Sequence, residues 1–155
     1  MTMWKRLVVP TDFSTGSRAA LKLALDLAKV HGAEVVLLHA AELPDMVDGA
    51  MKVQPDGAKA PMTLEAYTKL QAEGWMDEDC AATAASGAGV SLRKVVEVGP
   101  PVDTLLAVAA REKADLIVMG TQGRSGLTRW VLGSTAERVV RQSTIPVLTV
   151  RRSEG

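Results

Sequence analysis

Three glycines near the C-terminal end of the chain are spaced in a way that could hold phosphate groups. Gly120 and Gly123 follow the apolar run Asp115–Met119, and Gly133-Ser134 comes after nine further residues. Glycine lets another group approach the main chain closely, while the first amides of a helix lack internal partners and carry the positive end of the helix dipole. A buried strand that leads through this loop into a helix would therefore suit an anionic ligand, such as the phosphates of a nucleotide.

Polar side chains in the same segment could contribute to such a site. The hydroxyl groups of Ser134 and Thr135 could reach a phosphate or a phosphate-bound metal ion. No lysine precedes the serine, so the segment is not a Walker A loop. Neutralisation of the phosphates must then come from the main chain, from a metal ion, or from Arg124 and Arg129. These two arginines can be interpreted at least as well as ordinary solvated charges of a loop. The glycine spacing also has a simpler interpretation, because turns use glycine freely and this chain has 13 glycines.

Asp12 is the second candidate for ligand binding. It follows the apolar run Trp4–Val9, which Pro10 ends because proline has no N–H group and a fixed φ. A carboxylate after a strand can accept hydrogen bonds from the ribose hydroxyls, as it does in dinucleotide-binding folds. The alternative is purely structural, since Asp is favoured as an N-cap or turn residue before a helix.

Composition limits the classes of protein that the chain can represent. Its 155 residues, 47% of them hydrophobic, suit one domain over residues 1–155. Eighteen basic and eighteen acidic residues cancel, so no overall field would attract nucleic acid or an anionic membrane. The lone Cys80 excludes an intrachain disulfide and a cysteine-based zinc site. Residues 1–9 are too short and too charged for a signal peptide or a membrane span, so we expect a soluble cytoplasmic protein.

Apolar runs alternate with helical periodicity along the chain. Strands are predicted at 4–9, 34–39, 90–98, 115–119 and 146–150, and helices from Ser14 to Gly32, at 62–85, from Pro101, and at 133–141. This order predicts an α/β fold with parallel strands, right-handed crossovers and helices on both faces of the sheet. Residues 41–61 are rich in proline and glycine, fit no regular element, and are predicted to form an irregular loop.

Four expectations concern individual side chains. The helix at 62–85 is expected to bury Leu64, Tyr67, Leu70 and Trp75, and the helix at 133–141 to bury Ala136, Val139 and Val140. Asp77-Glu78-Asp79 is interpreted as a solvated helix face rather than a metal site. His39 is interpreted as a packed or capping residue without a catalytic role, because no nucleophile or acid is paired with it in the sequence.

The motif G-x2-G-x9-G-[ST] after the strand Asp115-Leu-Ile-Val-Met-Gly120 resembles the ATP-binding branch of the universal stress protein family. The likeness extends from Val8-Val-Pro10-Thr-Asp12 to Pro146-Val-Leu-Thr-Val150. It implies a Rossmann-like fold with an open five-stranded parallel sheet in the order 3-2-1-4-5. Strands one and four then flank the topological switch point, beyond which ligands bind in open α/β sheets.

The resemblance also implies how a ligand would be held. It places Asp12 on the nucleoside and Ala40 against the adenine, and it implies ATP as the ligand, with Mg or Mn bound through the phosphates. Neither a catalytic residue nor a protein metal ligand is expected. The expected nucleotide-binding residues are Pro10, Thr11, Asp12, Ala40, Met119, Gly120, Thr121, Gly123, Arg124, Gly133, Ser134 and Thr135.

Three functions remain open at this point. The preferred hypothesis is an ATP-binding regulatory protein of a stress response. The alternatives are a slow ATP hydrolase or nucleotide-using transferase in the same pocket, and a dimeric interaction module with a vestigial pocket. The resemblance implies a homodimer that pairs the last strand, Val147–Val150, with its twofold mate, although Arg151 and Arg152 could instead shield that edge.

Overall fold

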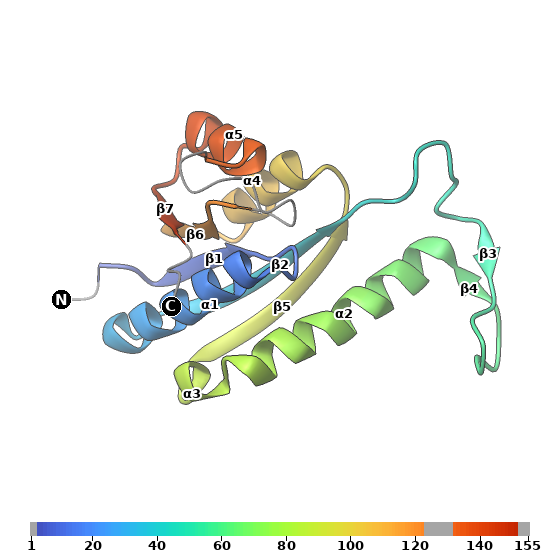
Figure 1. The fold of residues 1–155 in the computed structure, drawn as a ribbon, viewed down its shortest axis with the longest axis horizontal. Coiled ribbons are helices and arrows are strands. Elements are labelled where there is room, and N and C mark those ends of the chain that lie inside the picture. The colour runs from blue at the N-terminus through green and yellow to red at the C-terminus, as the bar shows by residue number, and fades with distance from the viewer. Residues whose placement is uncertain (1–2, 123–131, 152–155) are drawn as a thin grey trace.

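The protein is described here by a computed structural model that covers residues 3–122 and 132–151. Five parallel strands form its main sheet, β1 (Arg6–Pro10), β2 (Glu34–Ala41), β5 (Ser91–Val98), β6 (Leu116–Gly120) and β7 (Val147–Val150). They lie in the order β5-β2-β1-β6-β7 (Figure 1). Numbered among themselves along the chain, these strands have the order 3-2-1-4-5, so the expected topology is confirmed.

Helices cover both faces of this sheet. Helix α1 (Thr15–His31) and helix α2 (Leu64–Ala82), followed by the short α3 (Ala84–Gly87), lie on one face, and α4 (Pro101–Arg111) and α5 (Ser134–Gln142) lie on the other (Figure 1). Because successive side chains of a strand point to opposite faces, Leu7 and Val9 of β1 pack with α1 while Val8 packs with α4 and α5. All three are fully buried.

The ends of α1 follow from its flanking residues. Ser14 is the N-cap, and its side chain accepts a hydrogen bond from the Ser17 N–H. Gly32 ends the helix with φ 65°, the left-handed conformation that glycine adopts without steric cost. Basic residues in the last turn, Lys29 and His31, complement the helix dipole.

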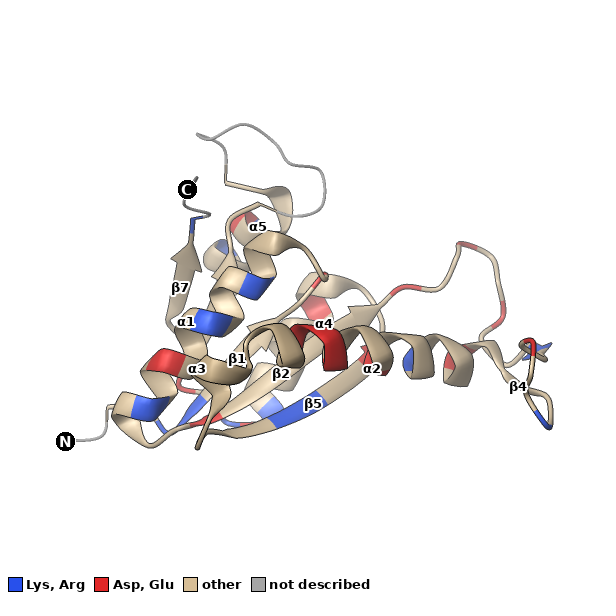
Figure 2. Ribbon diagram, turned by 60° about the horizontal axis from the view of Figure 1, so that its bottom comes forward, with Lys and Arg blue, Asp and Glu red and all other residues tan. Residues whose placement is uncertain are grey.

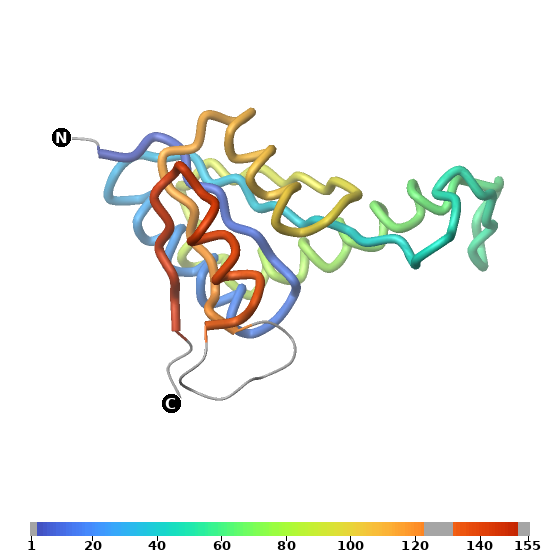
Figure 3. The backbone as a smooth tube through the Cα atoms, turned by 90° about the horizontal axis from the view of Figure 1, so that it is seen from above, coloured from blue at the N-terminus to red at the C-terminus, as the bar shows by residue number. Residues whose placement is uncertain are grey.

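The segment predicted to be an irregular loop contains a regular element. Strand β3 (Lys52–Val53) pairs antiparallel with β4 (Met62–Thr63), which leads directly into α2. Hydrogen bonds from Leu64 N to Met51 O and from Glu65 N to Gly49 O, 2.8 and 3.0 Å long, fix the ribbon to the start of α2. The ribbon and the first turns of α2 project away from the sheet (Figures 1 and 3). Sequence reasoning missed this ribbon because each strand has only two residues.

Two predicted helix faces are corrected by the structure. Helix α2 buries Ala72, Met76 and Asp79, whereas Leu70 and Trp75 are 56% and 45% exposed. The reason is that the N-terminal half of α2 projects from the sheet, and only its C-terminal half packs against it, through Ala72, Met76 and Asp79. In α5, Ala136 and Val139 are buried as expected, but Val140 is 48% exposed because only one narrow stripe of this short helix meets the sheet.

Charged residues are spread over the molecule. Figure 2 shows that both signs occur on α1 and on α2. Within the described residues, no helix combines the length and the apolar character needed to cross a bilayer.

Candidate functional site

A cavity of about 740 Å³ lies beyond the carboxyl ends of β1, β2 and β6. Its walls also include the start of α5 and part of α2. Every expected binding residue that the structure describes lines it, namely Pro10, Thr11, Asp12, Ala40, Met119, Gly120, Thr121, Gly133, Ser134 and Thr135. Gly123 and Arg124, like Arg129, lie outside the described residues. The cavity therefore occupies the switch point that the strand order predicts.

The segment between β1 and α1 is held by hydrogen bonds on both sides of Asp12. The Thr11 N–H donates to Leu38 O at 2.8 Å, and His39 Nδ1 lies 2.8 Å from Thr11 O. Asp12 Oδ1 accepts from the Ser14 N–H at 3.0 Å. Asp12 thus makes a turn before α1 and does not cap it, because Ser14 is the N-cap. His39 serves as a packed hydrogen-bonding residue, in agreement with its interpretation from the sequence.

Phe13 adopts an unusual backbone conformation beside Asp12. Its φ is 65°, in the left-handed region that residues with a Cβ avoid. Its N–H donates to Thr11 Oγ1 at 3.1 Å, and its ring packs against His39 and Trp75 with centroid distances of 4.5 and 5.3 Å. These contacts hold the sharp turn that brings Asp12 to the cavity.

Another wall of the cavity is the N-terminus of α5. Gly133 is its N-cap, and within the described residues no side chain caps this helix end. Gly133 N donates to Thr121 O at 2.6 Å, which joins the two ends of the glycine loop. Ser134 and Thr135 are exposed and line the cavity. A helix of nine residues therefore presents its positive end and two hydroxyl groups to the cavity.

Gly120 has a structural role that its place in the motif did not indicate. A Cβ on Gly120 would lie 2.9 Å from Gly16 C and 3.0 Å from Gly16 O, and one on Gly16 would lie 2.9 Å from Gln122 O. All three are backbone atoms, which cannot move aside. Gly120 therefore lets the first turn of α1 contact the end of β6, and neither Gly120 nor Gly133 has a positive φ.

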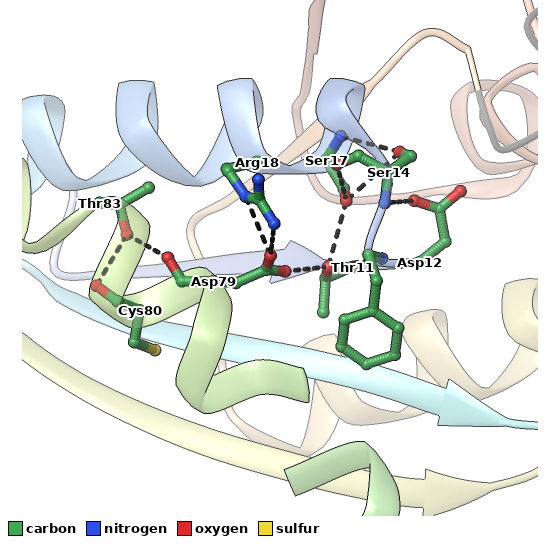
Figure 4. A network of polar contacts seen from close by, with 9 residues as sticks. Thr11, Asp12, Ser14, Ser17, Arg18, Asp79, Cys80 and Thr83 are labelled. Atoms are coloured by element: carbon green, nitrogen blue, oxygen red, sulfur yellow. Dashed lines mark hydrogen bonds and ion pairs between the residues drawn. The ribbon is translucent and has the colours of Figure 1, made fainter. Parts of the chain in front are cut away.

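A buried polar network lies directly behind Thr11 (Figure 4). Asp79 of α2 is 1% exposed; its Oδ2 accepts from Thr11 Oγ1 at 3.0 Å, and its Oδ1 accepts from Arg18 Nε and Nη2 at 3.1 and 2.8 Å. Ser17 Oγ lies 3.1 Å from Thr11 Oγ1. The expectation that Asp77-Glu78-Asp79 forms a solvated face is thus wrong for Asp79, which points inward on the buried stripe of α2. Asp77 and Glu78 are exposed.

Helix α2 supplies a wall of the cavity that sequence reasoning did not find. Thr68, Gln71, Ala72 and Trp75 line it, and Gln71 Nε2 donates to Tyr67 Oη at 2.8 Å. The exposure of Trp75 is explained by this position at the cavity. The sequence did contain one signal, the large aromatic residue Trp75 on this helix. Helical periodicity, however, led to the prediction that Trp75 packs in the core.

The side chains that line the cavity suit a metal ion only when that ion is carried by a larger ligand, such as a nucleotide. The described residues contain no group of three or more His, Cys, Asp or Glu side chains placed to hold a metal. Oxygen donors do occur among the lining residues, namely the carboxylate of Asp12 and the hydroxyl groups of Ser134 and Thr135. Mg²⁺ commonly binds through one or two protein oxygens together with phosphate oxygens and water.

Comparison with known proteins decides the family. Residues 3–151 match the profile described as "Universal stress protein family". The chain belongs to the universal stress protein family. Universal stress protein MJ0531 of Methanocaldococcus jannaschii is 34% identical to it over 156 residues, which cover 97% of this chain and 84% of that protein. The predicted membership of the universal stress protein family is therefore confirmed at the level of the family.

Solved structures of the universal stress protein family share the fold of this member. The M. jannaschii protein MJ0577 superimposes with a TM-score of 0.74 at 26% identity, covering 99% of each chain. A universal stress protein solved in complex with cAMP superimposes with a TM-score of 0.70, also at 26% identity, covering 97% of this chain and 99% of that one.

Proposed function

We propose that this universal stress protein is a nucleotide-binding regulatory protein of the stress response, and that ATP is its ligand. The observation that carries the proposal is that Asp12 and the N-terminus of α5 line one cavity at the switch point of the sheet. Its volume of about 740 Å³ lies within the range of small-molecule sites. The relative solved with cAMP supports an adenine nucleotide as the class of ligand.

Each wall of the cavity would recognise one part of the nucleotide. The main-chain amides and hydroxyl groups of Ser134 and Thr135 would bind the phosphates, with the helix dipole favouring their negative charge. The Asp12 carboxylate would accept hydrogen bonds from the ribose hydroxyls. The base would lie near Ala40, whose small side chain leaves space at the end of β2. Mg²⁺ would be held through the phosphates, where it neutralises their charge.

A charge substitution at Thr135 tests this arrangement without harming the helix. Thr135→Asp places a carboxylate in the first turn of α5, where the helix dipole favours it but a phosphate would be repelled. We expect the affinity for Mg-ATP to fall by roughly tenfold or more. Isothermal titration calorimetry measures it, and Thr135→Asn is the matched uncharged control, expected to lose much less affinity than Thr135→Asp because it adds no charge.

Two outcomes would overturn the proposal. Absence of calorimetric binding of Mg-ATP at millimolar concentration, with no adenine nucleotide released on denaturing freshly purified protein, would remove nucleotide binding altogether. Equal affinity of Thr135→Asp and Thr135→Asn would mean that phosphates do not bind at α5. Steady-state phosphate release above a buffer control would instead identify the protein as a slow ATP hydrolase.

We also propose that the protein forms a homodimer through β7. This strand is at the edge of the sheet, and its four residues, Val147–Val150, are only half-buried. An apolar edge strand has unpaired main-chain groups that a second copy can satisfy by continuing the sheet. Light scattering should show a dimer at high micromolar concentration, and a monomer under those conditions would exclude this interface.

A further inference from the structure

We infer that Asp79 is a positioning residue for ribose recognition, acting through Thr11 on the Asp12 carboxylate. This inference rests on the proposed nucleotide function. Asp79 comes from α2, and 68 positions of the sequence separate it from Thr11. It does not line the cavity itself, whereas Thr11 and Asp12 do. Its place behind the site, rather than in it, distinguishes it from a ligand-contacting residue.

The hydrogen bonds of the Thr11 hydroxyl group show how Asp79 acts. A carboxylate only accepts hydrogen bonds, so the single proton of Thr11 Oγ1 is directed to Asp79 Oδ2, at 3.0 Å. The lone pairs of Thr11 Oγ1 are then turned toward the Phe13 N–H, which donates at 3.1 Å, and toward Ser17 Oγ. Asp79 thereby orients the group that holds Phe13 in its left-handed conformation.

Asp12 lies between the two residues that this network fixes. On its N-terminal side, the Thr11 side chain is held by Asp79, and the Thr11 peptide is held by Leu38 O and by His39 Nδ1. On its C-terminal side, the Phe13 N–H is held by Thr11 Oγ1. The direction of the Asp12 side chain is set by these flanking peptides together with the Ser14 N–H, which donates to Asp12 Oδ1 at 3.0 Å. A change at Asp79 would therefore alter the direction of Asp12 without touching the ligand.

Stability alone is a poor explanation for a charge at position 79. The Asp79 side chain is 1% exposed, and its partner Arg18 is 41% exposed. Burying a carboxylate costs desolvation energy that an ion pair often does no more than offset, so an apolar residue on this stripe of α2 could pack equally well. Buried networks with satisfied hydrogen bonds do fix one geometry, and here that geometry is the turn that carries Asp12.

The test compares ATP with 2′,3′-dideoxy-ATP, which lacks both ribose hydroxyl groups. If Asp12 accepts hydrogen bonds from those groups, the wild type should bind ATP about tenfold or more tightly than the dideoxy analogue, since hydrogen bonds to charged groups contribute at least that factor. In Asp79→Asn, affinity for ATP should fall toward that for the analogue, while the affinity for the analogue changes little. The ratio of the two dissociation constants is the readout, because a general loss of structure lowers both affinities together.

Further variants keep the test independent of folding. Thr11→Val keeps the shape of the side chain but removes the hydroxyl group that links Asp79 to Phe13, so it should lower the ratio as Asp79→Asn does. Thr11→Ser restores the hydroxyl group and should restore the ratio. Glu78→Gln makes the same chemical change as Asp79→Asn at an exposed neighbouring position of α2 and should leave the ratio unchanged.

The outcomes separate this inference from the proposed function. A wild type that binds neither compound would refute the nucleotide function itself. A wild type that binds ATP, with the same ratio in Asp79→Asn and Thr11→Val, would overturn the positioning role and leave nucleotide binding intact. Equal losses of affinity for both compounds in these variants would likewise overturn it, because that result means a purely structural role for Asp79. A collapse of the ratio with recovery in Thr11→Ser would support it.

Discussion

Phe13 combines an unfavourable backbone conformation with favourable side-chain packing. Its φ of 65° costs about 1–2 kcal/mol in a residue that has a Cβ. Its ring contacts His39 and Trp75, and its N–H is bonded to Thr11 Oγ1. Backbone strain persists only where the surrounding contacts maintain it, and here those contacts hold the turn that includes Asp12 beside the cavity.

Two substitutions of Phe13 separate the backbone cost from the packing of the ring. Phe13→Ala loses the ring but keeps the strained φ, whereas Phe13→Gly loses the ring and relieves the strain. We therefore expect Phe13→Gly to be more stable than Phe13→Ala by about 1 kcal/mol, the reverse of the usual order. Urea denaturation of both variants measures the difference. A more stable alanine variant would show that this residue is not strained.

At the scale of elements, the start of α1 and the end of β6 are in close main-chain contact next to the cavity. Gly16 and Gly120 bring the two main chains together so tightly that a Cβ at either position would meet backbone atoms at 2.9 Å. The motif glycine at position 120 is thus explained by packing between elements, independently of any ligand. Gly74, by contrast, lies in α2 with nothing within 4 Å of the place where its Cβ would be.

The same substitution should have opposite effects at these two glycines. Gly120→Ala should destabilise the protein by about 1–3 kcal/mol, because α1 and β6 must separate to admit the methyl group. Gly74→Ala should stabilise it by about 0.5–1 kcal/mol, because alanine is the better helix former and meets no obstacle. Thermal unfolding monitored by circular dichroism compares them. The packing explanation fails if Gly120→Ala is as stable as the wild type.

At the scale of the whole molecule, an ion-pair cluster joins distant parts of the chain at the amino ends of the strands. Glu34 accepts from Arg6 Nε at 2.8 Å and from Arg93 Nε at 3.1 Å, and Arg93 also pairs with Glu112. The bond to Arg6, with that to Arg93, lowers the pKa of Glu34 from its ordinary value of 4.5. The bond to Arg93 lowers the pKa of Glu112 in the same way.

These lowered pKa values give the stability a dependence on pH with a definite sign. A carboxylate whose pKa is lower in the folded state stabilises that state above its ordinary pKa, 4.5 here, and this contribution is lost as the pH falls through the folded pKa. We expect the free energy of unfolding to decrease on going from neutral pH to about pH 3.5 and to decrease less in Arg93→Met, which removes a partner of both carboxylates.

Urea denaturation across this pH range measures the effect. Because the Arg93 side chain is 43% exposed, the difference should be small and should shrink further in salt. Arg141→Met, which removes an exposed pair with Glu137 on α5, is the matched control and should keep the pH slope of the wild type. Identical slopes in Arg93→Met and the wild type would show that the cluster makes no pH-dependent contribution.

The fold and the residues that line the cavity could be predicted from the sequence far better than the hydrogen-bond network behind Thr11. Apolar runs and glycine spacing identify strand ends, and in a parallel sheet the carboxyl ends of all strands meet at one edge, so Asp12 and Ser134 could be brought together from pattern and resemblance. The pairing of Asp79 with Thr11 could not, because it depends on the rotation of α2 about its axis. Trp75 was assigned to the core for the same reason.

The central position of β1 has a consequence for synthesis of the protein. It leaves the ribosome before the other strands of its sheet, yet one of its two edges is paired only when β6 has been made, and the Lys5 N–H donates to the Asp115 side chain 110 positions later. Until then the nascent chain has an apolar strand with an open edge, the kind of surface that associates with other chains. Translation that stops before β6 should therefore yield a fragment that depends on chaperones rather than a smaller folded unit.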